Sequence, residues 1–186
     1  DQGWTGRVQF LVIQQEPTDG DNGFESDNNE DGHDFEPISS PTIYNVTMLG
    51  SDNVDIAQRA MTIRRGTGGK LRNFIIAGFR KESIDIRDEE TVARLEDDGT
   101  LSFDNMILFN IGPDGETYFE DEVGEDDDDA GFQEESWFGA PEFDMRFGVD
   151  PMLSASAYDW ENPDFVPDQD SPAADGAASP PQGEFW

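Results

Sequence analysis

Four short segments of this chain begin with an amide side chain and continue into an apolar run of β-type residues. They recur roughly every 30 residues, and periods of about 20–50 residues are typical of solenoid folds. Each repeat of a solenoid packs only on its neighbours, so this recurrence constrains the shape of the whole chain. The segments are residues 9–13, 45–49, 73–77 and 105–109, headed by Gln9, Asn45, Asn73 and Asn105.

A second set of strands alternates with the first. Its members surround Phe24, Met61 and Ile84, and turns rich in Gly and Asp join the two sets. One strand of each kind makes a unit with the composition of one coil of a parallel β-helix, in which each strand pairs with its equivalent in the next coil. We therefore predict an all-β, right-handed parallel β-helix of about four coils with an extended C-terminal strap.

The amides are predicted to stack at a turn as a ladder, because Asn tolerates the left-handed backbone conformation. Gln9 is the member least suited to it. The outward positions Leu11, Ile75 and Ile107 are apolar, which predicts that the strap or a partner covers this face. Two inward files are expected, Phe10/Val46/Phe74/Met106 and Val12/Met48/Ile76/Leu108.

The charge of the chain restricts its partners. Lys and Arg total 11 against 43 Asp and Glu, a formal net charge of −32. Such a field repels nucleic acids and anionic lipids, and it favours cations, basic protein surfaces or a high-salt environment. Adaptation to high salt would explain the charge without any binding function. The chain has no cysteine, which excludes disulfides and thiolate chemistry, and no apolar run approaches the ~20 residues that span a bilayer.

Composition divides the chain into three parts. Residues 1–112 hold the predicted coils, residues 113–136 form an acidic low-complexity loop, and residues 137–186 form an aromatic strap rich in Pro, Ala and Asp. The start at Asp1 is that expected of a processed product or a fragment.

The C-terminal part carries a resemblance to known proteins. Residues 150–153 (DPML), 162–165 (NPDF) and 171–177 (SPAADGA) are similar to the closing segment of bacterial right-handed parallel β-helix proteins of the pectate-lyase-like superfamily. Residues 40–50 and 66–79 are similar to large exported bacterial proteins of unassigned function. The resemblance implies the fold and export from the cytoplasm. It does not select an activity, because this superfamily includes lyases, hydrolases, adhesins and scaffolds.

Carbohydrate cleavage on such a fold needs paired carboxylates, or an acidic calcium site with a basic residue. No matching motif is present, and solvated acidic surface explains the acids. We therefore predict that the chain is not an enzyme. The residues considered are Asp85, Asp88, Asp104, Arg80, Lys81 and the lone His33, which falls in a loop.

One acidic stretch has the oxygen density that Ca²⁺ prefers. Asp27, Asn29 and Asp31 alternate, so their side chains can converge in a turn, although the full calcium-loop pattern is absent. These residues are the predicted metal ligands of a structural Ca²⁺, the one cofactor considered, and a solvated loop is the alternative.

Aromatic side chains mark the third part of the chain. They are predicted to form a docking patch or a sugar-stacking platform, with packing of the strap onto the β-helix as the alternative. The basic pairs Arg64-Arg65 and Arg80-Lys81 are predicted to be neutralised by nearby acids. The predicted interaction residues are Trp137, Phe138, Phe143, Phe147, Tyr158 and Trp160.

These features favour a non-catalytic structural or interaction subunit, exported to the periplasm or cell surface. Its expected partners are other protein subunits of a larger extracytoplasmic or membrane-bound assembly, without nucleic acid and without a transmembrane segment of its own. The alternative is an extracellular module that binds or cleaves polysaccharide with the help of structural Ca²⁺.

Overall fold

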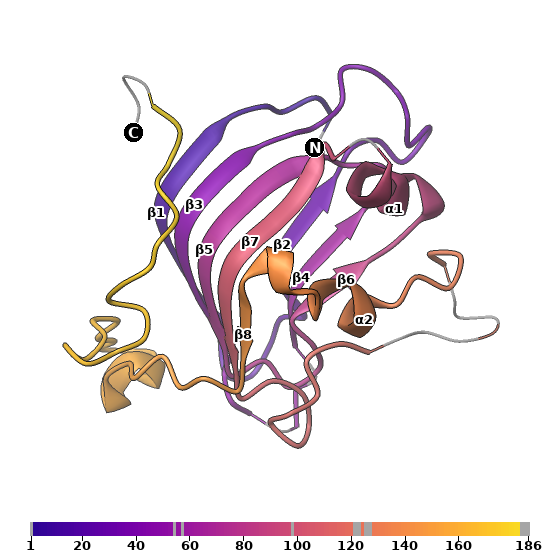
Figure 1. Ribbon diagram of the computed structural model, residues 1–186. Helices are drawn as coiled ribbons and strands as arrows, with labels where there is room; N and C mark the ends of the chain where they lie inside the picture. Colours follow the sequence, from indigo (N-terminus) through magenta and orange to yellow (C-terminus); the bar gives the residue numbers. More distant parts are fainter. Residues whose placement is uncertain are drawn as a thin grey trace.

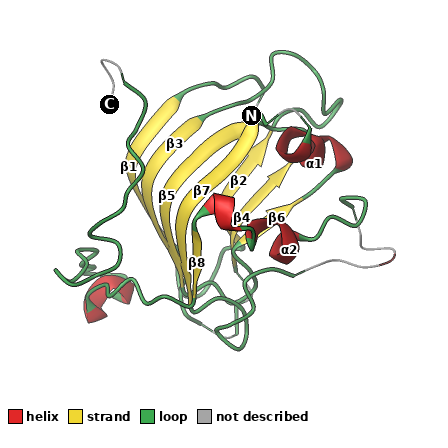
Figure 2. Cartoon of the chain, in the orientation of Figure 1, coloured by secondary structure: helices red, strands yellow, loops and turns green. Residues whose placement is uncertain are grey.

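Two parallel β-sheets wind around a shared apolar core (Figures 1 and 2). The computed structural model describes residues 2–53, 55–56, 58–97, 99–120, 124 and 128–182. Sheet A contains β1 (Arg7–Gln14), β3 (Thr42–Leu49), β5 (Gly69–Ala77), β7 (Leu101–Phe109) and β8 (Met145–Phe147), in that order. Sheet B contains β2 (Asn22–Asp27), β4 (Arg59–Arg64) and β6 (Ile84–Ile86).

The chain passes alternately between the two sheets, and every strand pair within them is parallel. Each of the first three coils therefore contributes one strand to each sheet. Side chains that point inward from both sheets fill the space between them, as in any parallel sheet covered on one face. The predicted all-β parallel β-helix is confirmed.

The turn ladder lies one residue later in the first coil than predicted. Leu11 pairs with Val46, so the partner of Asn45 is Phe10 and not Gln9. Phe10, Asn45, Asn73 and Asn105 share left-handed backbone angles, with φ of 59°, 58°, 60° and 53°. The prediction of Gln9 was wrong because it matched residues by side-chain type, whereas the backbone turn sets the register.

This register also corrects the two inward files in the first coil. Their first members are Leu11 and Ile13, while Phe10 is 76% exposed and Val12 is 46% exposed. The other members are placed as predicted, with Val46, Phe74 and Met106 in one file and Met48, Ile76 and Leu108 in the other, all at most 2% exposed. The outward residue of β1 is accordingly Val12, not Leu11.

Helix α1 (Glu89–Glu96) follows β6. Glu89 and Glu90 lie in its first turn and Arg94 in its last, which suits the helix dipole. Thr91 and Leu95, one turn apart, are buried. No helix in the part of the chain that the structure describes is long and apolar enough to cross a membrane.

The segment after β7 closes the C-terminal end of the coils. Helix α2 (Glu134–Phe138) and a 3-10 turn (Pro141–Phe143) lead into β8, which adds a fifth strand to sheet A. Phe119 and Phe132 are buried in the core, so this acidic part contributes to packing as well as to charge. Within residues 113–136, predicted to be an acidic low-complexity loop, Asp126 and Asp127 lie outside the described residues, which resume at Asp128.

The remaining chain forms the strap on the outer face of sheet A (Figure 1). A 3-10 turn (Ala155–Tyr158) interrupts an otherwise extended path. Leu153, Tyr158 and Phe165 pack against Leu49 and Ala77, which point outward from β3 and β5. The strap thus covers one end of the outward apolar surface.

Candidate interaction surface

The asparagine ladder joins neighbouring coils through side-chain amides. Asn73 Nδ2 donates to Asn45 Oδ1 over 2.7 Å, and Asn105 Nδ2 donates to Asn73 Oδ1 over 2.8 Å. In the last coil Asp144 holds the ladder position, with φ of 46°, and Arg146 Nη2 donates to Asn105 Oδ1 over 3.0 Å. The ladder therefore has an arginine at one end and Phe10, which lacks an amide, at the other.

The ladder also binds the strap. Asn73 pairs with both backbone groups of Ala178, accepting from its N–H over 2.8 Å and donating to its carbonyl over 2.9 Å. Asn105 Nδ2 donates to the Gly176 carbonyl over 3.0 Å. Arg146 Nη1 donates to the Pro172 carbonyl over 2.9 Å. The ladder, predicted as a stack of amides, thus also binds the backbone of an extended segment.

A groove of about 230 Å³ lies between the strap and sheet A. Its floor includes Thr47, Ile75 and Ile107, successive residues of the outward file. Its lining also includes the ladder amides, Phe10 and Arg146 from sheet A, and Ala173, Asp175 and Ala177 from the strap. The small side chains of the strap leave this space unfilled.

The first coil is incompletely covered. Val8, Leu11, Ile13 and Phe24 point toward the core but are only partly buried, whereas their equivalents in the later coils are at most 2% exposed. Trp4 is also 47% exposed. Together with Phe10 and Val12, these residues form the first-coil surface. An apolar surface beside an open strand edge is a typical place for another chain to bind.

Comparison with protein families gives one finding. The model of the pectate-lyase-like β-helix domain matches residues 1–137. The chain belongs to this β-helix family. Comparison with curated proteins and with solved structures gives no match.

The outer face of sheet B of this β-helix domain carries a buried ionic network. Arg59 lies 2.9 Å from both Glu82 Oε1 and Asp85 Oδ2. Arg87 Nε also lies 2.9 Å from Asp85 Oδ2. The Glu82 and Asp85 side chains are at most 1% exposed, so these arginines compensate carboxylates that water does not reach. The arrangement neutralises charge, and it presents no pair of free carboxylates for acid–base chemistry.

Two of the three predicted calcium ligands, Asp27 and Asn29, make hydrogen bonds within the β-helix domain. Asp27 accepts hydrogen bonds from Arg64 and Arg65, each over 2.8 Å. The hydrogen bond that Arg64 donates to Asp27 is the main reason that the pKa of Arg64 is raised. Asn29 Oδ1 accepts from the Asp31 amide over 2.9 Å. Among the described residues no group of three or more acidic, His or Cys side chains is arranged to hold a metal ion.

The basic pairs are neutralised as predicted. Arg64 and Arg65 bind Asp27, Arg80 binds Asp52, and Lys81 Nζ lies 3.5 Å from Glu120. His33 Nδ1 lies 3.0 Å from Glu90 Oε2 on α1, and this bond is the main reason that the pKa of Glu90 is lowered. The His33–Glu90 contact joins the long loop between β2 and β3 to α1.

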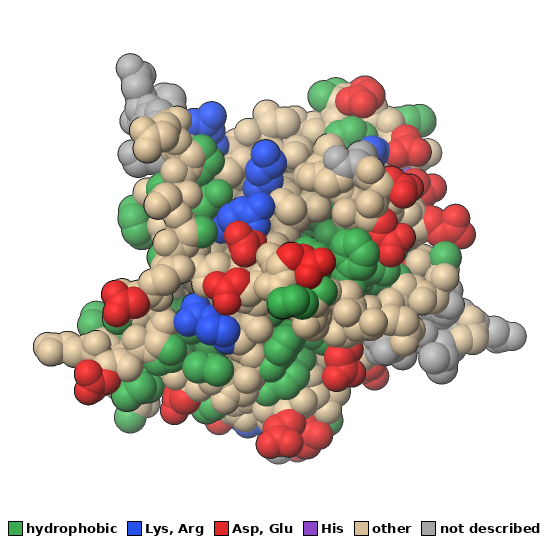
Figure 3. Space-filling model, in the orientation of Figure 1, with side chains coloured by type: hydrophobic (Ala, Val, Ile, Leu, Met, Phe, Trp, Pro, Cys, Tyr) green, Lys and Arg blue, Asp and Glu red, His purple; other side chains and the backbone are tan. Residues whose placement is uncertain are grey.

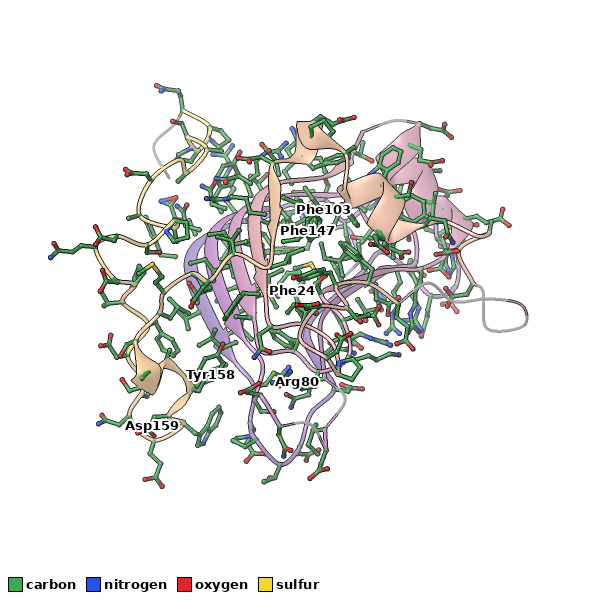
Figure 4. All side chains as sticks on the ribbon, turned by 60° about the horizontal axis from the view of Figure 1, so that its bottom comes forward. Phe24, Arg80, Phe103, Phe147, Tyr158 and Asp159 are labelled. Atoms are coloured by element: carbon green, nitrogen blue, oxygen red, sulfur yellow. The ribbon has the colours of Figure 1, made fainter. Side chains whose placement is uncertain are left out.

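Five of the six predicted interaction aromatics serve in packing. Phe138 is fully buried, edge-on to Phe103 at 5.2 Å and stacked on Phe119 at 5.4 Å, so its assignment to a docking patch was wrong. Trp137, Phe143 and Phe147 are partly buried in the same cluster. Tyr158 packs with the strap outside sheet A, while Phe24, Phe103 and Phe147 point between the sheets (Figure 4). Trp160, 48% exposed, stays a predicted contact residue.

Sequence reasoning missed Phe10 and Arg146. The available signal was positional. Residues 144–147 (DMRF) follow the pattern of residues 105–108 (NMIL) with Asp in the amide position, and residues 10–13 follow it with Phe in that position. Matching the apolar residues after the turn, and not the amide itself, would have found both.

Proposed function

We propose that this β-helix domain is a non-catalytic interaction module that joins a larger assembly through its first-coil surface. The observation that carries the proposal is Phe10, an aromatic residue 76% exposed at a left-handed turn position. A left-handed conformation costs a bulky L-residue about 1–2 kcal/mol. An exposed Phe at this position gains little from packing within the domain. This suggests that Phe10 is kept there because its ring contacts a partner.

The strands and side chains around Phe10 indicate what kind of partner would bind there. Among the described residues, β1 and β2 each pair with one strand only, so both have an open edge at the first coil. A partner that supplies two strands with the spacing of a coil would pair with both edges and cover Leu11, Ile13 and Phe24. Such pairing combines backbone hydrogen bonds with burial of apolar side chains. The partner is therefore a protein with a β-helix-like surface.

The proposed setting is outside the cytoplasm, on the periplasmic side or at the cell surface, within an extracytoplasmic or membrane-bound assembly. The resemblance of residues 40–50 and 66–79 to exported proteins supports this setting. Buried pairing of Glu82 and Asp85 with arginine supports the absence of catalysis, because neither carboxylate is available to a substrate.

The family match favours a second candidate, an extracellular polysaccharide-binding or polysaccharide-cleaving module. Phe10 and the side chain of Asn45 line the same groove, and an aromatic ring beside an amide suits a sugar. Structural Ca²⁺ would belong to this candidate. Ca²⁺-dependent depolymerisation of uronic-acid polymers by the purified chain would establish it and exclude the first.

The test of the first candidate is the variant Phe10→Asn in the native host. Asn suits the left-handed turn, so the variant keeps the fold while losing the exposed ring. We expect the tagged wild-type chain to co-purify stoichiometrically with its assembly and the variant to lose it. Phe35→Asn is the matched control, because Phe35 is 57% exposed in the loop between β2 and β3, away from β1. Equal recovery of the assembly with all three proteins would refute the proposal.

A further inference from the structure

Arg146 occupies an unusual place among the basic residues. It lies on β8 opposite Ile107, at the end of the outward file that begins with Val12. The strands of sheet A carry Arg7, Lys70, Arg72 and Arg146 but a single acid, Asp104. Figure 3 shows Lys and Arg side chains in this part of the molecule, with Asp and Glu side chains beside them.

Its contacts leave part of the guanidinium group unused. Of five N–H donors, one bonds the Asn105 amide oxygen and one bonds the Pro172 carbonyl. Nε is buried and has no hydrogen-bond partner. Both acceptors are neutral, so the positive charge has no counter-ion in these bonds.

This lack of a counter-ion contrasts with the rest of the chain, which has 43 acids. Within the described residues no carboxylate lies within 4.0 Å of the Arg146 nitrogens. A partly buried cation without an anion is costly, and an anion that meets it forms a strong charge-assisted bond. Seven other arginines do have carboxylate partners, namely Arg59, Arg64, Arg65, Arg72, Arg80, Arg87 and Arg94.

The groove beside Arg146 has room for a small molecule. Its volume of about 230 Å³ corresponds to roughly eight water molecules at about 30 Å³ each. Thr47, Ile75 and Ile107 give it an apolar floor. A short hydrocarbon tail fits that floor, and a carboxylate fits the guanidinium.

We propose that the groove between the strap and sheet A binds a carboxylate attached to a short apolar chain, with Arg146 as its ion-pair partner. The carboxylate can belong to a free small acid or to a Glu side chain of an extended peptide. The groove and the first-coil surface share Phe10, but the proposal does not need the first-coil partner, because it places the ligand under the strap beside Arg146 and not at the open strand edge.

Two features oppose an anion here, and one of them provides a test. The net charge of −32 repels anions at long range, but at physiological ionic strength charges separated by more than about 8 Å are largely screened. Asp175, an exposed residue of the strap, lines the groove itself. Its charge should weaken binding, so Asp175→Asn should strengthen it.

The experiment titrates the full chain with butyrate and with butyramide, which share shape and differ in charge, and follows binding by NMR. We expect butyrate to bind at least about tenfold more tightly than butyramide, the ratio that about 1.4 kcal/mol produces. Arg146→Gln should remove this preference, whereas Arg72→Gln, at a paired surface arginine, should keep it. Asp175→Asn should raise the butyrate affinity several-fold.

The peptide arm of the experiment compares an extended Ala-rich peptide containing one Glu with the same peptide containing Gln. Preference for the Glu peptide over butyrate assigns the site to a peptide ligand, and the reverse assigns it to a free acid. Equal binding of butyrate and butyramide would overturn the proposal. So would unchanged butyrate affinity in Asp175→Asn, a variant at an exposed position whose folding is not in question.

Discussion

At the scale of single residues, the left-handed turn position decides how each coil is built. Of the five turn positions along sheet A, three hold Asn, the first holds Phe10 and the last holds Asp144. Asn adopts this conformation at low cost, and its amide bonds the next rung. Phe10 has neither property, so the fold does not require a Phe at this position. Its exposed ring belongs instead to the first-coil surface.

The variant Phe10→Asn is therefore predicted to stabilise the isolated chain. Relief of the left-handed strain gives a gain of about 1 kcal/mol in the free energy of unfolding. Urea denaturation followed by circular dichroism measures it, with Phe10→Ala as the control that removes the ring without adding an amide. A lower midpoint for Phe10→Asn than for the wild type would contradict this account of the turn.

Phe10 also shows how much of the candidate site could be predicted from the sequence alone. Asn45, Asn73 and Asn105 were identified as a ladder because an amide before an apolar run is visible in the sequence. Phe10 was missed because its position follows from strand register, and the nearby Gln9 matched by chemistry. Arg146 was missed for the same reason, since Asp144 replaces the Asn that marks the other turns and β8 has only three residues.

At the scale of elements, the strap is held by backbone recognition. Its contacts with Asn73, Asn105 and Arg146 all involve its main chain. Residues 174–177 are exposed, so these bonds and not apolar burial fix this part of the strap. Sequence predicted an extended strap but not its binding to the ladder, because small residues such as Ala and Gly give no sign of where their backbone docks.

Ala178→Pro is predicted to release the end of the strap. Proline lacks the N–H that donates to Asn73 Oδ1, so the paired contact is lost. Limited proteolysis of residues 172–182 should become several-fold faster, with little change in thermal stability. Ala178→Ser keeps the N–H and should behave as the wild type. Equal cleavage rates in both variants would show that the ladder does not hold the strap.

The loop between β2 and β3 depends on a different contact, the bond between His33 and Glu90. This bond lowers the pKa of Glu90 below its ordinary value of 4.5. A lowered pKa in the folded state means that the contribution is present above pH 4.5 and is lost as the pH falls through the folded value. His33→Ala should therefore be less stable than the wild type at pH 6, and the difference should shrink below pH 4.

Thermal unfolding of both proteins between pH 3 and pH 6 checks this prediction. The informative quantity is the difference in stability between the two proteins at each pH, because the many other acids of both proteins also titrate in this range. Asp31→Ala, a change in the same loop away from the pair, is the control. A difference between His33→Ala and wild type that is constant with pH would exclude the bond as its cause.

At the scale of the whole molecule, the fold was predictable and the function was not. A repeat of about 30 residues is enough to indicate a solenoid, since each coil must bury its apolar face on the next. Function does not follow from that scaffold, because the same β-helix supports many activities. The features of this chain that bear on its function are local ones. They are Phe10 at the open first coil, Arg146 under the strap, and the neutralised carboxylates of sheet B.

The net charge of −32 is the remaining property of the whole chain. Repulsion among so many carboxylates favours the unfolded state, because unfolding increases their separation. Salt shortens the range of this repulsion, to about 10 Å at 0.1 M and about 3 Å at 1 M. The paired carboxylates Glu82 and Asp85 are buried and less screened, so salt should relieve repulsion more than it weakens them.

Raising NaCl from 0.1 M to 1 M is therefore predicted to increase the melting temperature by several degrees. Scanning calorimetry measures the shift, and sucrose at equal osmolality is the control for effects that do not depend on charge. A similar rise in both would assign the effect to solvent exclusion. If the chain folds only in molar salt, its charge is an adaptation to a high-salt environment. If the chain is already folded at 0.1 M NaCl, the acidic surface can instead influence which partners approach.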